Sequence, residues 1–250
     1  MSTIFAYTRF EVARTLRNTR FLVVTLLMPA VLYLVFRQAS GGAASGAAGA
    51  VVMVAMAGFS MINAAIGANT TSLPAERASG WLRQLRITPL SAGGWVTARI
   101  AQATVAVIPG LAVISVCGLL IGHVEMSAAQ WAGLLLLVLA GSIPFSFLGL
   151  LLGQVLDAQA AGPMQGLVTM LLSFGGGLFL PITMFPEPLR TAAGLLPTHL
   201  LFAAGQGVVA SRLPDASDVA GLAAWAVALA ALALAIWSRQ DGRRVLAVVR

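Results

Sequence analysis

The chain has 250 residues, of which 59% are hydrophobic and only 9% are charged, and its mean hydropathy is +0.92. Soluble domains carry about 25% charged residues, so this composition excludes a soluble globular protein and predicts an integral membrane protein. All 15 basic residues are arginine and the formal net charge is +7, an excess that in a membrane protein indicates orientation rather than nucleic-acid binding. The single cysteine, Cys117, excludes an intramolecular disulfide.

Residues 3–18 are predicted to form an amphipathic helix that lies in the lipid headgroup region. At helical spacing Phe5, Val12 and Leu16 share one side. Arginines occupy another broad arc, namely Arg9, Arg14, Arg17 and Arg20. A frayed basic leader is the alternative, whereas a cleaved signal peptide is disfavoured because further apolar segments follow.

Six apolar stretches are each long enough to cross a bilayer, which takes about 20 helical residues. The connections between them are too apolar or too short to form a soluble domain, so residues 1–250 are predicted to be one all-α polytopic transmembrane domain. We expect Pro109 to interrupt the third span. The predicted spans cover residues 20–37, 47–68, 99–121, 130–153, 163–182 and 219–238.

Two asparagines, Asn63 and Asn69, lie near the far end of the second span. A polar side chain there can line a substrate path or bond to a neighbouring helix, and packing is the favoured reading. Glycine pairs at i, i+4 spacing allow close helix approach, either within the bundle or between two copies. These pairs are Gly118 with Gly122, Gly149 with Gly153, and Gly162 with Gly166.

The connection 183–218 is the longest, and prolines divide it into pieces. Two of these pieces, 188–196 and 198–207, are predicted to be short helices. Neither can span a bilayer, so we expect re-entrant or interfacial elements between the fifth and sixth spans.

Charged residues return in a segment between the second and third spans. This segment cannot lie in hydrocarbon, where each arginine costs about 2.5–3.5 kcal/mol. We expect a short amphipathic helix at the membrane surface, bracketed by Pro74 and Pro89. Its charges are Glu76, Arg77, Arg83 and Arg86.

Arginine counts predict the orientation, because loops kept in the cytoplasm accumulate arginine. With both termini, segment 70–97 and Arg99 at the start of the third span on one side, that side holds twelve of the 15 arginines. The other side holds Arg37, Arg190 and Arg212. We therefore expect a multi-pass protein of the plasma (cytoplasmic) membrane with both termini in the cytoplasm.

Neither a catalytic nor a metal site is predicted. His123 and His199 lie in different connections without cysteine or carboxylate ligands at metal-site spacing. A phosphate-binding loop of the G-x-x-x-x-G-K-[ST] type is absent, since the chain has no lysine. We expect a chain that is not an enzyme and that binds no cofactor of its own.

The charged segment reads Glu76-Arg77-x-x-Gly80-x-Leu82-x-x-Leu85-Arg86-x-x-Pro89-Leu90-Ser91. It resembles the cytoplasmic loop between the second and third spans of type-2 ABC transporter permeases, the membrane subunits of drug and polysaccharide exporters. The layout of the chain is similar to that family, and two outer-loop runs, 185–189 and 196–198, resemble its pattern.

The resemblance implies a division of labour between this chain and a separate ATPase subunit, which would bind ATP and Mg. The helix around 76–90 would fit a groove on that ATPase, with Leu82 and Leu85 as anchors. Further coupling positions would be Glu76, Arg77, Gly80, Arg83, Arg86 and Pro89. The arginine face of the N-terminal helix, Arg9, Arg14 and Arg17, would lie beside the same ATPase.

The resemblance also implies that two permease subunits, two copies or one copy with a homologue, line the path. The uncharged spans favour a hydrophobic or amphipathic substrate such as a drug, a lipid or a lipid-linked molecule. The alternative function is a non-transporting integral membrane protein, either an assembly factor or a membrane enzyme with an unrecognised site.

Overall fold

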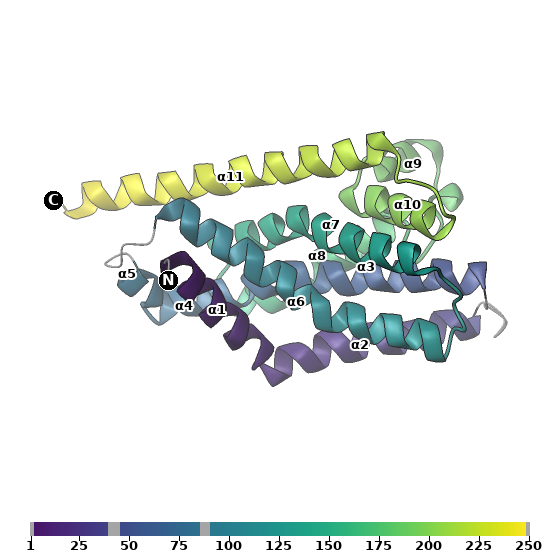
Figure 1. Cartoon of the computed structure of the whole chain (residues 1–250). Coiled ribbons are helices and arrows are strands. Elements are labelled where there is room, and N and C mark those ends of the chain that lie inside the picture. Colours follow the sequence, from purple (N-terminus) through teal and green to yellow (C-terminus); the bar gives the residue numbers. More distant parts are fainter. Residues whose placement is uncertain (1–2, 40–45, 86–90, 249–250) are drawn as a thin grey trace.

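A computed structural model describes residues 3–39, 46–85 and 91–248 of the chain. The regular secondary structure of these residues is entirely helical, without a strand, and the long helices run side by side in one bundle (Figure 1). The elements are α1 (Thr3–Leu16), α2 (Thr19–Ala39), α3 (Ala47–Thr70), α4 (Ser72–Ala78), α5 (Trp81–Leu85), α6 (Ala92–Leu120), α7 (Ala128–Val155), α8 (Ala158–Gly175), the 3-10 helix η1 (Ile182–Met184), α9 (Glu187–Gly194), α10 (Pro197–Val209) and α11 (Ala216–Val248).

Helix α3 forms the centre of the bundle and contacts α2, α6, α7, α8 and α10. Alanine, glycine and serine make up much of α3, and small residues let neighbouring backbones approach closely in a membrane. A Cβ atom on Gly149 of α7 would lie 2.3 Å from the Ile66 carbonyl oxygen. The Thr70 hydroxyl donates to the Gly149 carbonyl across the same contact, at 3.2 Å. Helices α3 and α7 therefore pack backbone against backbone.

Four helical stretches are long and apolar enough to cross a membrane, among the described residues. They are α3 continuing through α4, most of α6, all of α7, and the first two-thirds of α11. The pair α9 and α10, bent by 75°, would make a fifth if it counted as one broken span. Predicted spans 20–37 and 163–182 correspond to the shorter helices α2 and α8, so the count of six stays a prediction.

Several boundaries differ from the predicted ones. Helix α6 begins at Ala92, where the Ser91 side chain accepts a hydrogen bond from the Gly94 amide, and not near residue 99. The expected interruption at Pro109 is wrong, because α6 continues through it. Neighbouring helices satisfy or shield the backbone groups that a proline frees, so membrane helices tolerate it.

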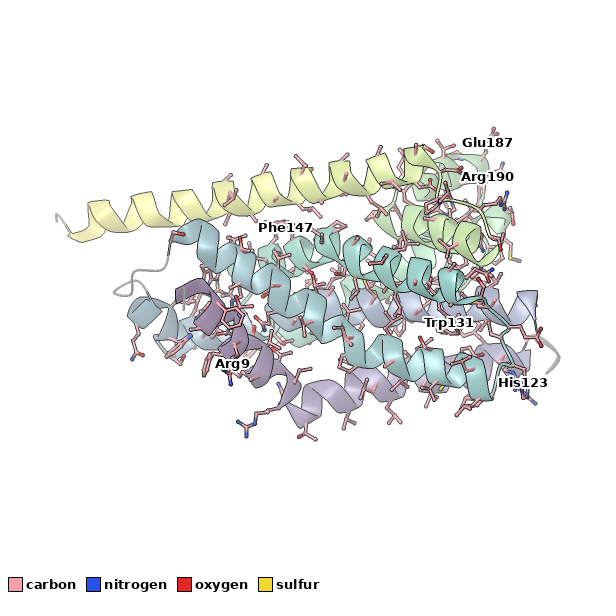
Figure 2. All side chains as sticks on the ribbon, in the orientation of Figure 1. Arg9, His123, Trp131, Phe147, Glu187 and Arg190 are labelled. Carbon is pink, nitrogen blue, oxygen red and sulfur yellow. The ribbon has the colours of Figure 1, made fainter. Side chains whose placement is uncertain are left out.

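The two ends of the bundle differ in character. Helices α1, α4 and α5 and the end of α11 gather at one end (Figure 1). The opposite end carries α9 and α10 and the connection with His123, and Figure 2 shows Glu187 and Arg190 there on α9. The two short helices predicted in the 183–218 connection are confirmed as α9 and α10.

The glycine pairs have different surroundings. A Cβ atom on any member of the first two pairs would lie within 2.6 Å of an atom of a neighbouring helix, at Gly118, Gly122, Gly149 and Gly153. These pairs pack inside the bundle. A Cβ atom on Gly162 or Gly166 of α8 would meet nothing within 4 Å. The third pair therefore leaves an open surface.

Candidate functional site

Four charged side chains meet where α1, α4 and α6 converge. They are Glu11 and Arg14 from α1, Glu76 from α4 and Arg99 from α6. The side chains of Glu11 and Arg99 are fully buried and that of Glu76 is 6% exposed. We call this group the ion cluster. It joins α1 and α4 to α6, most of which is a candidate membrane span.

Within the ion cluster both arginines reach both carboxylates. Arg99 Nη2 donates to Glu76 Oε2, and Arg14 Nη2 donates to Glu76 Oε1. Glu11 Oε2 lies 3.1 Å from Arg14 Nη2 and 3.5 Å from Arg99 Nη1. Two positive and two negative groups cancel, which is the condition under which buried charges are tolerated. Each partner therefore depends on the others.

Polar neighbours hold Arg99 in place. Its Nη1 donates to Gln102 Oε1 at 3.3 Å and to Ser72 Oγ at 3.4 Å. Gln102 in turn donates to the Thr15 hydroxyl at 2.7 Å. The guanidinium carbon also lies 5.6 Å from the ring centroid of Trp95, within cation–π range. Helices α1, α4 and α6 are thus tied at several points.

Burial raises the pKa of the Glu11 carboxyl above its ordinary value, and the Arg99 guanidinium partly opposes this effect. The nearby Glu76 carboxylate raises this pKa further. Burial therefore makes the charge of Glu11 costly to keep in the folded protein.

Arg77 ties α4 to the end of a different helix. Its two terminal nitrogens donate to the carbonyl oxygens of Gln154 and Leu156. Those carbonyls belong to the last turn of α7 and its C-cap, where helical carbonyls lack partners within their own helix. A positive charge there also opposes the negative end of the helix dipole. Helix α4 is therefore fixed to α7 as well as to α1 and α6.

Gly80 makes the turn between α4 and α5. Its φ is +77°, a left-handed conformation that glycine adopts without strain. Beyond it, Trp81 contacts Phe10 of α1, with ring centroids 6.0 Å apart. Leu82 is half-buried and packs on a small core formed by residues that include Trp95.

The predicted coupling residues thus divide into groups. Glu76 and Arg77 point into the protein, whereas Gly80 and Leu82 form the turn and start of α5. The side chains of Arg83 and Leu85, and the whole of Arg86 and Pro89, lie outside the described residues. On α1, Arg9 and Arg17 are exposed and Arg14 is partly buried in the ion cluster. Figure 2 labels Arg9 on this end of the molecule.

The two asparagines suggested for a path contact neighbouring helices. Asn63 Oδ1 accepts a hydrogen bond from Gln165 Nε2 of α8 at 2.8 Å. Asn69 is fully buried, and its Nδ2 donates to the Arg99 carbonyl of α6 at 3.5 Å. Both contacts link α3 to a neighbour within one chain.

Sequence reasoning missed the inner stripe of α1 and the role of Arg99. Among the residues of α1 whose burial is described, Tyr7, Glu11 and Thr15, at i, i+4 and i+8, are buried, whereas Phe5 and Leu16 are exposed. This polar stripe at helical spacing was a readable signal. The arginine count of the sequence places Arg99 at the membrane surface, where the predicted third span begins, whereas its side chain is fully buried in the structure. Among the described residues, no group of three or more His, Cys, Asp or Glu side chains could hold a metal ion.

These features define an all-helical, multi-pass membrane protein with a charged cluster buried at one end of its bundle. The chain belongs to the ABC-2 type transporter family, whose sequence profile matches residues 2–209. A protein of Bacillus subtilis (strain 168) named "Putative transport permease YvfS" is 28% identical over 191 residues, which cover 76% of this chain and 78% of that protein. The predicted family resemblance is confirmed, and the chain is a membrane permease subunit of an ABC transporter.

Proposed function

We propose that this permease subunit exports a hydrophobic or amphipathic molecule from the cytoplasm, driven by a separate ATPase that docks on the α4–α5 segment. One observation carries the proposal: the Glu76–Arg99 pair joins this segment to α6 in a buried network. A force applied to α4 would reach a membrane-crossing helix without passing through a flexible linker. Nucleotide-driven closure of the ATPase would then shift the bundle between an inward-facing and an outward-facing packing.

In this proposal the members of segment 76–90 have separate tasks. Glu76 and Arg77 hold the segment, since both engage other helices of the same chain. The turn at Gly80 and the residues after it would meet the ATPase, with Leu82 and Leu85 as anchors and Arg83 and Arg86 as charged contacts. The exposed Arg9 of α1 would lie beside the same partner.

The ATPase would hold ATP and Mg, and this chain would bind neither. The absence of lysine from the sequence supports this division, because the common phosphate-binding loop requires one. The end of the bundle that carries α1, α4 and α5 would face the cytoplasm, in agreement with the arginine count of the sequence.

A second permease subunit, either another copy or a homologue, would complete the path. The open glycine pair of α8, Gly162 and Gly166, supports a contact there, because close helix approach in lipid uses this spacing. Exposed apolar side chains continue the same helix beyond this pair, at Leu167, Met170, Leu171 and Phe174.

The substrate class follows from the lining that the spans can offer. The candidate spans hold few charged groups, and Arg99, which does lie in one, is neutralised by the ion cluster. Such a lining favours a drug, a lipid or a lipid-linked molecule over a small hydrophilic ion.

Co-purification separates this proposal from a non-transporting membrane protein. The chain would be expressed in membranes with the ABC ATPase encoded beside it, and the complex and its ATP hydrolysis would be measured. We expect a stable complex and ATP hydrolysis that differs from that of the ATPase alone. Absence of a complex together with unchanged ATP hydrolysis would favour an assembly factor or an unrecognised membrane enzyme.

A further inference from the structure

A groove of about 950 Å³ separates α1 from α4. The wall formed by α1 carries Phe10, Ala13, Arg14 and Arg17, which are spaced i, i+3, i+4 and i+7 and so share one face of the helix. The opposite wall comes from the last turns of α3, from α4 and from Trp81. A cavity of this size holds a small molecule or a lipid headgroup.

Two contacts fix which parts of the walls face each other. Phe10 meets Trp81, with ring centroids 6.0 Å apart, and Arg14 pairs with Glu76. The walls therefore run in opposite directions, and Arg17 lies toward the end of α3, about 10 Å along α1 from Phe10. The candidate span that contains α3 continues through α4 to Ala78, so the α3 end of the groove lies deeper along that span than the Trp81 end. Arg17 thus marks the membrane end of the groove.

The charge at this end is not balanced. Arg14, Glu11, Glu76 and Arg99 neutralise one another in the ion cluster. Arg17 is exposed, and no ion pair within the described part of the chain includes it. An arginine at the membrane boundary attracts phosphate groups of anionic lipids.

Hydroxyl oxygens line the wall across from Arg17. The Thr71 hydroxyl donates to the Gly67 carbonyl at 2.8 Å and the Ser72 hydroxyl donates to the Ala68 carbonyl at 2.7 Å. Their hydrogens are thus engaged. The Thr71 oxygen can accept hydrogen bonds from a ligand, and the Ser72 oxygen, which already accepts from Arg99 Nη1, keeps one further lone pair. The groove offers a cation for a phosphate and acceptors for hydroxyl groups close by.

We propose that this groove binds the headgroup of an anionic phospholipid, with the phosphate on Arg17 and the headgroup hydroxyls on Thr71 and Ser72. Phosphatidylglycerol has this chemistry. Its acyl chains would leave the groove at the Arg17 end, beside the α1–α2 corner. Because Arg14 of the same wall belongs to the ion cluster, the bound lipid would brace the contact between α1 and α4.

Native mass spectrometry of the purified protein, titrated with phosphatidylglycerol and with phosphatidylcholine, tests this proposal. The wild type should retain phosphatidylglycerol selectively, and Arg17→Gln should weaken this retention about five- to tenfold. Arg17→Lys should keep most of it. The matched control is Arg190→Gln, which removes an exposed arginine at the other end of the bundle and should leave retention unchanged. Thr71→Val should weaken retention less than Arg17→Gln.

Two competition arms identify the source of the phosphate. Short-chain phosphatidylglycerol should displace the retained lipid, whereas inorganic phosphate at the same concentration should not. Equal displacement by inorganic phosphate would overturn the lipid assignment, and equal losses in Arg17→Gln and Arg190→Gln would overturn the site. If Arg17→Gln weakened ATPase binding but left lipid retention intact, the groove would be a partner contact and the proposal would also fail.

Discussion

Glu76 and Arg99, separated by 23 residues in the chain, form a hydrogen-bonded ion pair in the interior of the bundle. Glu76 belongs to the charged segment that the sequence presents as a surface feature. Arg99 lies in the first third of α6, at a depth where an unpaired guanidinium would be costly. The pair therefore places a residue of the charged segment inside the bundle, where it links α4 to α6.

Removing one partner of this pair should destabilise the protein strongly. Arg99→Leu leaves two buried carboxylates with only Arg14, and the expected loss is about 3–5 kcal/mol in the free energy of unfolding. Denaturant unfolding in detergent micelles measures this loss. Arg190→Leu, at an exposed position on α9, is the control and should change stability by less than about 0.5 kcal/mol.

The pair should also show energetic coupling. Glu76→Gln and Arg99→Gln, made singly, each leave the ion cluster with one uncompensated charge, whereas the double variant keeps Glu11 and Arg14 and is balanced. The double variant should therefore lose less stability than the sum of the two single variants, by about 1–3 kcal/mol. Additive losses would contradict a direct interaction between the two side chains.

The raised pKa of Glu11 predicts a pH dependence of stability. The folded state binds a proton at Glu11 more readily than the unfolded state does. Proton binding at Glu11 therefore stabilises the folded state, and this contribution to the free energy of unfolding is fully present below the ordinary glutamate pKa. It is lost as the pH rises through the raised pKa. Melting temperatures of the wild type and of Glu11→Gln, from about pH 4 to about pH 8, isolate the effect. As the pH rises, the melting temperature of the wild type should fall relative to that of Glu11→Gln. A wild-type melting temperature that rises relative to that of the variant would contradict this prediction.

The turn before α5 should depend on glycine. Gly80→Ala places a side chain at φ +77° and should cost about 1 kcal/mol, although the space around it is open. Gly93→Ala is the matched control, since Gly93 is also in open space but lies within α6 and has no positive φ. It should leave stability unchanged or raise it by about 0.5–1 kcal/mol. Equal effects of the two changes would show that the backbone conformation at position 80 does not require glycine.

The glycine pairs should respond differently to large side chains. Gly149→Leu forces a side chain into the backbone of α3 and should prevent folding, seen as loss of a monodisperse peak in detergent. Gly166→Leu should leave the single subunit folded and weaken its association, measured by chemical crosslinking in membranes. Unchanged association of the subunits in Gly162→Leu and in Gly166→Leu would exclude α8 as the contact between them.

The sequence was sufficient for the helical membrane class, the family and most helix positions, because long apolar stretches separate clearly from charged ones. It was insufficient for the ion cluster. Hydropathy places Arg99 at the edge of a span, and only the packing of α1 against α6 shows that it is buried. The pairing of Glu76 with residues on two other helices likewise depends on tertiary contacts that no local pattern contains.

The sequence also could not predict which residues of α1 are buried against the protein. Two kinds of residue, apolar and basic, were assigned to two sides of the helix. The structure adds a third side, formed by Tyr7, Glu11 and Thr15, that faces the protein. A helix that lies against both lipid and protein needs such a division, and a two-sided reading of amphipathicity cannot reveal it.

In the proposed mechanism, the segment after Gly80 couples this permease to its ATPase. The most direct test compares Leu82→Asp/Leu85→Asp with Leu189→Asp/Leu195→Asp, a control that changes exposed leucines of α9 and its C-cap at the opposite end. Melting temperatures confirm folding, because Leu82 packs partly on its own chain.

Substrate-stimulated ATP hydrolysis by the reconstituted complex is the measurement. With Leu82→Asp/Leu85→Asp, this hydrolysis should fall to the level of the ATPase alone. With Leu189→Asp/Leu195→Asp, it should stay at the wild-type level. Wild-type hydrolysis in a folded Leu82→Asp/Leu85→Asp variant would contradict the coupling role of this segment.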